Sequence, residues 1–224
     1  MVRRTAAVLA VGMGTVLVGC GGDDGNGVAD LGVDEILAEA QEAIDAQETA
    51  RIVGSGTLEG ETMDLDLTYG VDSAIGVIGL GGAEFELTSV DGNVYMYGGA
   101  ESWTQLGGEA FASMLADKYV LVPADDPSFA DMAEFLDLSA MTAELLVPDG
   151  EVTKGEESEI DGQAVIALVD EDGSTLHIAT TGEPLPVQVT PPEGESGTLD
   201  FEWDIEVDIT APDEADVVDL TELM

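Results

Sequence analysis

Basic residues are scarce in this chain of 224 residues, which has 5 Lys and Arg against 48 Asp and Glu and a formal net charge of −43. A nucleic-acid-binding protein needs a basic surface that displaces counterions from phosphates, so the composition excludes that class of function. The same charge disfavours anionic membrane surfaces and anionic soluble ligands as electrostatic partners. Hydrophobic residues nevertheless make up 45% of the chain, which is enough apolar material for a folded core.

Residue types that carry catalysis and metal binding are also scarce, with one cysteine, Cys20, and one histidine, His177. A single cysteine excludes an internal disulfide framework and a Cys-rich metal site. No Gly-x-Ser-x-Gly motif and no phosphate-binding loop occur. The acidic run at Asp170–Gly173 lacks the spaced ligands of a calcium loop and is interpreted as a hairpin turn. We therefore predict no catalytic residue, no metal and no cofactor; a hydrolase is the enzymatic alternative, because triads assemble in space.

The N-terminal segment differs from the rest of the chain, because no Asp or Glu precedes Asp23. Arg3 and Arg4 are followed by the uncharged, mostly apolar run Thr5–Val18, then Gly19 and Cys20. This order is typical of a signal peptide over residues 1–19 that ends in a lipobox, with lipidation of Cys20 after cleavage. An uncleaved anchor is the alternative, although the apolar run is shorter than the ~20 residues that a span needs. The sequence leaves open whether export is Sec- or Tat-dependent.

Lipidation at Cys20 predicts a protein tethered to the cell membrane on its extracytoplasmic face. Residues 20–32 are rich in Gly, Asp and Asn without periodicity, which predicts a flexible linker. Apolar residues then recur at helical spacing from Val33 to Thr49 and predict an amphipathic helix.

From Arg51 the apolar pattern changes to a period of two, typical of strands. Helical spacing returns at Phe111–Leu115, at 128–136 with Ser128 as N-cap, and after Ser139, a second possible N-cap. The longest alternation is the last one, Leu199–Ile209, which predicts one long strand with an apolar face and an acidic face. The remaining predicted strands cover residues 64–69, 73–80, 84–88, 94–97, 119–122, 152–160, 163–169, 175–180 and 185–189.

This order of elements predicts an α+β fold in which one curved antiparallel sheet carries helices on its concave face. Several stretches in this order resemble the actinobacterial LppX/LprA/LprF/LprG lipoproteins, relatives in fold of the LolA/LolB carriers. The resemblance rests on the lipobox at Cys20, the helix from Val33 and the stretches Met63–Trp103, Asp161–Leu168, Thr181–Val189 and Ala211–Leu220.

The resemblance implies a half β-barrel around helices, with residues 33–224 as a single domain that binds acyl chains in an apolar cavity. It further implies a non-enzymatic protein that carries lipid or glycolipid through the envelope, and the lack of basic residues predicts a ligand without a strongly anionic headgroup. The alternatives are a filled core at the same positions and a surface interaction or sensor module without lipid. The residues predicted to line the cavity are Leu65, Leu67, Phe85, Leu87, Val94, Met96, Phe111, Met114, Leu115, Met132, Phe135 and Leu136.

The excess of acidic residues predicts that salt stabilises the protein, because dissolved ions screen the repulsion between carboxylates. We expect the melting temperature to rise as salt is increased from dilute buffer to the molar range. Thermal melts followed by circular dichroism across a salt series measure this, and a melting temperature that is flat or falls with salt contradicts the prediction.

Overall fold

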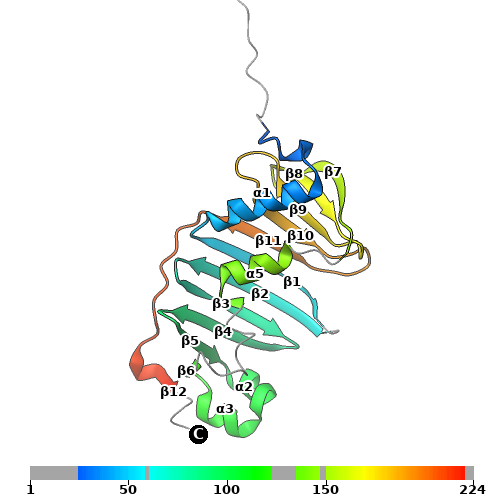
Figure 1. Cartoon of the computed structure of the whole chain (residues 1–224). Coiled ribbons are helices and arrows are strands. Elements are labelled where there is room, and N and C mark those ends of the chain that lie inside the picture. The colour runs from blue at the N-terminus through cyan, green and yellow to red at the C-terminus, as the bar shows by residue number, and fades with distance from the viewer. Residues whose placement is uncertain (1–24, 59–60, 123–134, 147–149, 220–224) are drawn as a thin grey trace, which may run out of the picture.

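The structure is a computed structural model that describes residues 25–58, 61–122, 135–146 and 150–219. Among these residues, twelve strands form one sheet in the order β12-β6-β5-β4-β3-β2-β1-β11-β10-β9-β8-β7 (Figure 1). The strands are β1 Ala50–Leu58, β2 Glu61–Gly70, β3 Ser73–Leu80, β4 Ala83–Val90, β5 Asn93–Gly98, β6 Tyr119–Val122, β7 Thr153–Ile160, β8 Gln163–Val169, β9 Thr175–Ala179, β10 Pro186–Thr190, β11 Thr198–Trp203 and β12 Val217–Asp219.

Neighbouring strands pair antiparallel except β12, which pairs parallel to β6. The helices are α1 Val33–Asp45, α2 Ala100–Gly107, α3 Glu109–Leu115 and α5 Leu138–Leu145, with short 3₁₀ turns η1 Val28–Asp30 and η2 Glu214–Asp216. Helices α1 and α5 lie across one face of the sheet, whereas α2 and α3 lie at the end that carries β5 and β6 (Figure 1). The predicted α+β class, a curved sheet with helices on its concave face, is confirmed.

Two groups of buried apolar side chains hold the helices on the sheet. Around α1, Ile36, Ala40 and Ile44 pack against side chains of β8 and β9 such as Ile166 and Ile178. The second and larger cluster joins β1, β2, β4, β5 and β6 to Trp103 of α2 and Leu115 of α3. The strands contribute alternate residues, as a one-sided sheet requires: Leu65, Leu67 and Tyr69 of β2 are buried, while the residues between them are not.

Helix α1 is shorter than predicted and ends at Asp45 rather than Thr49. Residues 26–32, part of the predicted flexible linker, are held on the domain. The Asn26 side chain donates hydrogen bonds to the carbonyl oxygens of Ala179 (3.0 Å) and Gly182 (3.2 Å), and Val28 is buried. Lys154 adds hydrogen bonds to two carbonyl oxygens of this segment, at 2.8 and 2.9 Å. These hydrogen bonds join residues that are far apart in the sequence, so the composition of the segment could not predict them.

The predicted long strand Leu199–Ile209 is wrong in its second half, because β11 ends at Trp203. Asp204 adopts a left-handed backbone conformation (φ 53°), which breaks the ladder. The apolar residues that follow still alternate with exposed ones, and Val207 and Ile209 lie against Gly70 at the end of β2. The chain therefore runs along the ends of the strands to the far edge, where it forms β12 beside β6 (Figure 1).

The connection between β5 and β6 holds a helix that the sequence did not predict, α2, beside the predicted α3. Asp137 rather than Ser139 caps α5, since its Oδ1 accepts a hydrogen bond from the amide of Ala140 (2.8 Å). The helix predicted over 128–136 lies largely outside the described residues.

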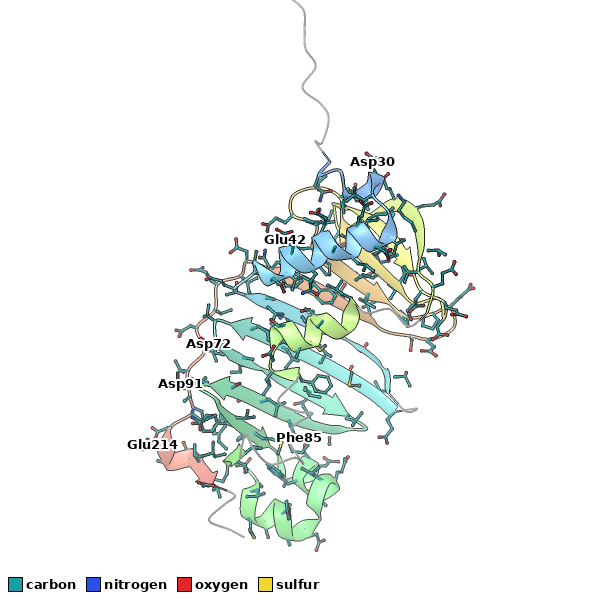
Figure 2. All side chains as sticks on the ribbon, viewed as in Figure 1. Asp30, Glu42, Asp72, Phe85, Asp91 and Glu214 are labelled. Carbon is teal, nitrogen blue, oxygen red and sulfur yellow. The ribbon has the colours of Figure 1, made fainter. Side chains whose placement is uncertain are left out.

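Acidic side chains occupy the solvent side of the sheet and its turns, such as Asp72 and Asp91 in Figure 2. The guanidinium of Arg51 lies among these carboxylates. Arg51 forms two parallel hydrogen bonds with Asp66 on β2, both 2.8 Å, and a third with Glu202 on β11 (3.1 Å). The hydrogen bonds from Arg51 lower the pKa of Asp66. Arg51 therefore bridges three adjacent strands on the outer face.

Gly54 lies in β1 where the neighbouring strand comes close, because a methyl group there would collide with the backbone of Thr198 and Leu199. We expect Gly54→Ala to reduce the free energy of unfolding by at least ~2 kcal/mol, since backbone cannot move aside as a side chain can. Gly56→Ala is the matched control on the same strand, because nothing lies within 4 Å of the added atom. Urea denaturation of both variants measures this; equal losses would contradict the close approach.

Candidate functional site: a half-open apolar pocket

A pocket of about 450 Å³ lies between the concave face of the sheet and α2. Its size falls within the ~300–1,000 Å³ range typical of small-molecule sites, and most of its wall is apolar. The wall comprises Glu61, Ile78, Leu80, Gly81, Ala83, Phe85, Leu87, Met96, Gln105, Leu106 and Phe135.

Strand register places the apolar wall of the pocket. Ile78 of β3 pairs with Phe85 of β4, and Leu87 of β4 pairs with Met96 of β5. Residues that pair directly point to the same face of a sheet, so these four side chains form one patch on the concave side. The turn between β3 and β4 adds Leu80 and Ala83 at the mouth.

Helix α2 forms the opposite wall because Trp103 fixes it to β4 and β5. The indole of Trp103 is buried and meets the ring of Phe85 edge-on, with centroids 5.1 Å apart and planes at 72°. The Oγ of Ser102 accepts a hydrogen bond from the amide of Glu84 (3.1 Å). These contacts orient Gln105 and Leu106, one turn further along the helix, toward the pocket.

Phe135 enters the pocket from the segment that precedes α5, and Tyr69 holds that segment in place. The Tyr69 hydroxyl donates a hydrogen bond to the carbonyl oxygen of Phe135 (2.7 Å). Burial, and secondly the charge of Asp137, raise the pKa of Tyr69 well above its usual value. The phenol therefore stays protonated and able to donate across the neutral range.

The structure separates the twelve predicted cavity residues into groups. Phe85, Leu87, Met96 and Phe135 line the pocket. Phe111 and Met114 are exposed on α3 and do not line it. Met132 lies outside the described residues. The other five are buried in the adjacent core cluster: Leu65, Leu67, Val94, Leu115 and Leu136.

Phe111 and Met114 differ from the prediction because α3 buries its other side, Ala112 and Leu115. Helical spacing grouped Phe111 and Met114 with Leu115, but the structure buries Leu115 and leaves the other two exposed. Spacing alone cannot say which side of a short helix faces the sheet. Seven lining residues were not predicted: Ile78, Leu80, Ala83 and Leu106, together with Glu61, Gly81 and Gln105. For the first two a signal existed, since Ser73–Leu80 is an aliphatic run beside the predicted strands.

Charge near the pocket is low and entirely negative. Glu61 and Gln105 are the polar side chains of the wall, and no basic side chain belongs to it. Two of the basic residues in the described chain are occupied elsewhere, Arg51 by carboxylates and Lys154 by carbonyl oxygens. A cationic site for a phosphorylated headgroup is therefore absent from the described wall.

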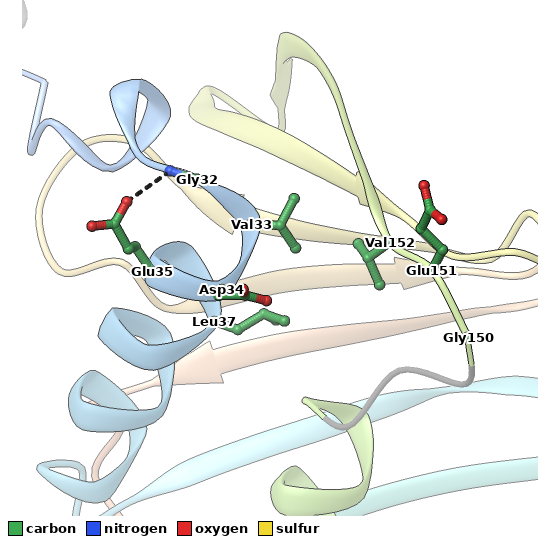
Figure 3. Close-up of a pocket in the computed structure, with 8 residues that line it drawn as sticks. All are labelled: Gly32, Val33, Asp34, Glu35, Leu37, Gly150, Glu151 and Val152. Carbon is green, nitrogen blue, oxygen red and sulfur yellow. Dashed lines mark hydrogen bonds between the residues drawn. The ribbon is translucent and has the colours of Figure 1, made fainter.

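A larger hollow of about 570 Å³ lies at the start of α1, beside residues 150–152 (Figure 3). Val33 and Val152 face each other across it, but Asp34, Glu35 and Glu151 make its wall acidic. Glu35 turns back and accepts a hydrogen bond from the amide of Gly32 (3.1 Å), so it serves the helix start. The smaller apolar pocket is the better candidate for a ligand site.

His177 and Asp170, which could in principle serve catalysis or metal binding, lie in a strand and in a hairpin turn. His177 is half-buried on β9, and burial lowers its pKa, which favours the neutral ring. Asp170 accepts hydrogen bonds from the amides of Gly173 and Ser174, both 2.8 Å, as the hairpin turn requires. The described residues contain no group of three or more His, Cys, Asp or Glu side chains that could hold a metal ion.

The fold defined by this sheet and its helices is shared with a solved structure. LprF from Mycobacterium bovis superposes with a TM-score of 0.51 at 15% sequence identity, over 80% of this chain and 96% of LprF. The similarity confirms the resemblance to the LppX/LprA/LprF/LprG proteins at the level of the fold.

Two further structures match with lower scores. An uncharacterised conserved protein from Thermus thermophilus has a TM-score of 0.42 at 12% identity, over 83% of this chain and 98% of that one. A DUF1329 family protein from Desulfovibrio piger has 0.27 at 13%, over 79% and 95%. No family model and no curated protein matches the sequence. Within the described ranges, no helix has the length and apolar character needed to cross a membrane.

Tyr69→Phe is expected to lower the free energy of unfolding by about 1 kcal/mol, because it removes one buried hydrogen bond to Phe135 without leaving a cavity. Tyr95→Phe is the control, since the Tyr95 hydroxyl makes no hydrogen bond within the described residues. Urea denaturation measures both changes. If the two variants lose the same stability, the hydrogen bond does not secure the segment.

Proposed function

We propose that this chain is a non-enzymatic lipoprotein, anchored through Cys20 on the extracytoplasmic face of the cell membrane, that binds acyl chains and carries lipid or glycolipid through the envelope. One observation carries the proposal: the sheet and α2 leave a half-open pocket whose wall is apolar, formed by side chains such as Phe85, Leu87 and Leu106. Apolar pockets of this size prefer apolar ligands, because bound acyl carbons leave water.

Three further features support the proposal. The lipobox places the only cysteine at the end of the apolar N-terminal run. The fold is shared with LprF. Met96 gives the pocket an adaptable side chain, and the thioether suits ligands of varied shape.

The charge of the protein supports a ligand without a strongly anionic headgroup. Glu61 is the charged residue of the wall, and the chain as a whole carries −43. A neutral glycolipid or an acylglycerol meets no repulsion there, whereas a phosphorylated headgroup would meet a carboxylate with no compensating cation.

The second candidate is an interaction or sensor module that has this fold and no lipid ligand. It is favoured by the dense packing beside the pocket, where Leu65, Leu67 and Leu115 are almost fully buried in the core cluster. The two candidates differ in one measurable quantity, the amount of lipid bound per protein.

Ala83→Trp tests the lipid proposal, because Ala83 lies at the mouth and an indole there would fill the pocket. We expect the full-length protein, purified from membranes in a nonionic detergent, to bind a fluorescent monoacylglycerol about tenfold more weakly after this change, a loss of ~1.4 kcal/mol. Ala46→Trp is the control, since Ala46 is exposed at the end of α1, outside the pocket.

Mass spectrometry of organic extracts from the same preparations gives a second measurement. Stoichiometric lipid in the wild-type protein that falls in Ala83→Trp supports the proposal. Absence of bound lipid in the wild type, or equal binding by both variants, would favour the interaction module instead.

A further inference from the structure

Exposed apolar side chains gather beside the pocket mouth. The exposed fractions are 41% for Leu80, 57% for Leu106, 43% for Phe111 and 53% for Met114. We call these four residues the apolar tip. Large apolar side chains grouped on a surface mark contact sites, whereas single ones are ordinary.

The apolar tip is continuous with the pocket. Leu80 and Leu106 belong to both, since they line the pocket and are exposed at its mouth. Gly107, the next residue of α2, packs against the ring of Phe111. Met114 follows Phe111 by three residues on α3, which places both on one side of that helix. An apolar surface therefore extends from the pocket mouth over α2 and α3.

Charge is nearly absent from this part of a highly acidic chain. Between Ser102 and Ala116, Glu109 is the only charged residue, although charged residues make up 24% of the sequence. Within the stretch 102–116, which the structure describes in full, there are neither basic residues for an anionic surface nor a row of carboxylates for a basic partner. The tip fits a surface that offers apolar contact at low charge, and a bilayer with neutral headgroups has that chemistry.

The apolar tip lies far from the end of the domain that is joined to Cys20. Asn26 is bonded to the loop after β9, whereas α2 packs against β4 and β5. β9 and β5 are seven strands apart in the sheet, or about 34 Å at ~4.8 Å per strand. The six residues from Cys20 to Gly25 are joined by five Cα–Cα steps, which together span at most ~18 Å. Figure 1 shows the first described residues and α2–α3 at opposite ends of the sheet.

We propose that the apolar tip docks on a second bilayer with neutral headgroups, opposite the membrane that holds Cys20, so that the pocket mouth opens onto that bilayer. The proposal rests on the proposed function, because the pocket gives the docking its purpose. Insertion of Leu106, Phe111 and Met114 among the headgroups would let an acyl chain pass between pocket and bilayer without crossing water.

The experiment uses a polarity-sensitive fluorophore on Met114→Cys in the full-length protein. The protein is reconstituted into phosphatidylcholine vesicles through its own N-terminal segment, and a second population of phosphatidylcholine vesicles is then added. The protein-bearing vesicles are kept dilute, so that they rarely meet one another, and we expect a blue shift of emission only after the second addition. Val71→Cys is the matched reporter, because Val71 is 64% exposed in the turn between β2 and β3, outside the tip.

Leu106→Asp, combined with the reporter, should raise the concentration of added vesicles that gives half the blue shift by about tenfold. Val71→Asp should leave that concentration unchanged. A blue shift before the second addition would contradict docking on an opposing bilayer. Absence of any shift would exclude a bilayer as the occupant of the tip. A stronger response to phosphatidylglycerol vesicles than to phosphatidylcholine vesicles would exclude a preference for neutral headgroups.

Failure of the docking proposal can be told apart from failure of the proposed function. The fluorescent monoacylglycerol titration is repeated on the same preparations. Lipid binding without a reporter response overturns only the docking. Absence of lipid binding by the wild-type protein overturns the proposed function, whether or not the reporter emission shifts.

Discussion

The structure depends on the burial of one face of a wide, curved sheet. Leu65, Leu67 and Tyr69 in β2, like Val94 and Met96 in β5, point to the concave face and lose their contact with water. The positions between them hold polar residues, such as Asp66 and Thr68 in β2 and Tyr95 in β5. Solvent and salt screen the repulsion between carboxylates on this outer face. Because a strand alternates its side chains with a period of two, one chain can hold a net charge of −43 and a continuous apolar face without conflict.

The pocket exists because the helices cover this face unevenly. Helix α1 closes over β8 and β9, and its small side chains Ala40 and Ala43 allow close packing there. At the other end, α2 is held by Trp103 against Phe85 and stands beside the sheet, so that part of the apolar face stays open. The hydrogen bond from Tyr69 to the carbonyl oxygen of Phe135 also holds the segment before α5 in place. The same side chains that fix the helices therefore shape the space between them.

The geometry of the molecule links its charge to its proposed task. Acidic residues surround the sheet, while the stretch from Ser102 to Ala116 holds one charge. Residues of this stretch line the pocket, and α2 packs against β4 and β5, whereas Asn26 is bonded to the end of β9. A carrier with this arrangement is repelled by anionic surfaces over most of its body, and four of its exposed apolar side chains are grouped where its ligand would enter.

Local sequence signals predicted most strands, and they failed where an element depends on distant partners. The alternation after Trp203 correctly indicates an extended chain with one side buried, since Ile205, Val207 and Ile209 are half-buried. It could not indicate that hydrogen-bond pairing with β1 ends after Trp203. That ending follows from the left-handed backbone of Asp204 and the turn of the chain toward β6. Helix α2 was missed because it is only 8 residues long, and Trp103, which holds it in place, packs on Phe85 of another element.

The sequence by itself determined which side chains share a face, because the periods of strand and helix are local properties of the backbone. Phe85, Leu87 and Met96 could be assigned to the concave side from their alternation alone. Only the tertiary structure decided that these three line a pocket while Leu65 and Leu67 are sealed in the core, and that Phe111 and Met114 face water. That choice depends on where α2 and α3 come to rest against the sheet, and packing between distant segments, not periodicity, sets their position.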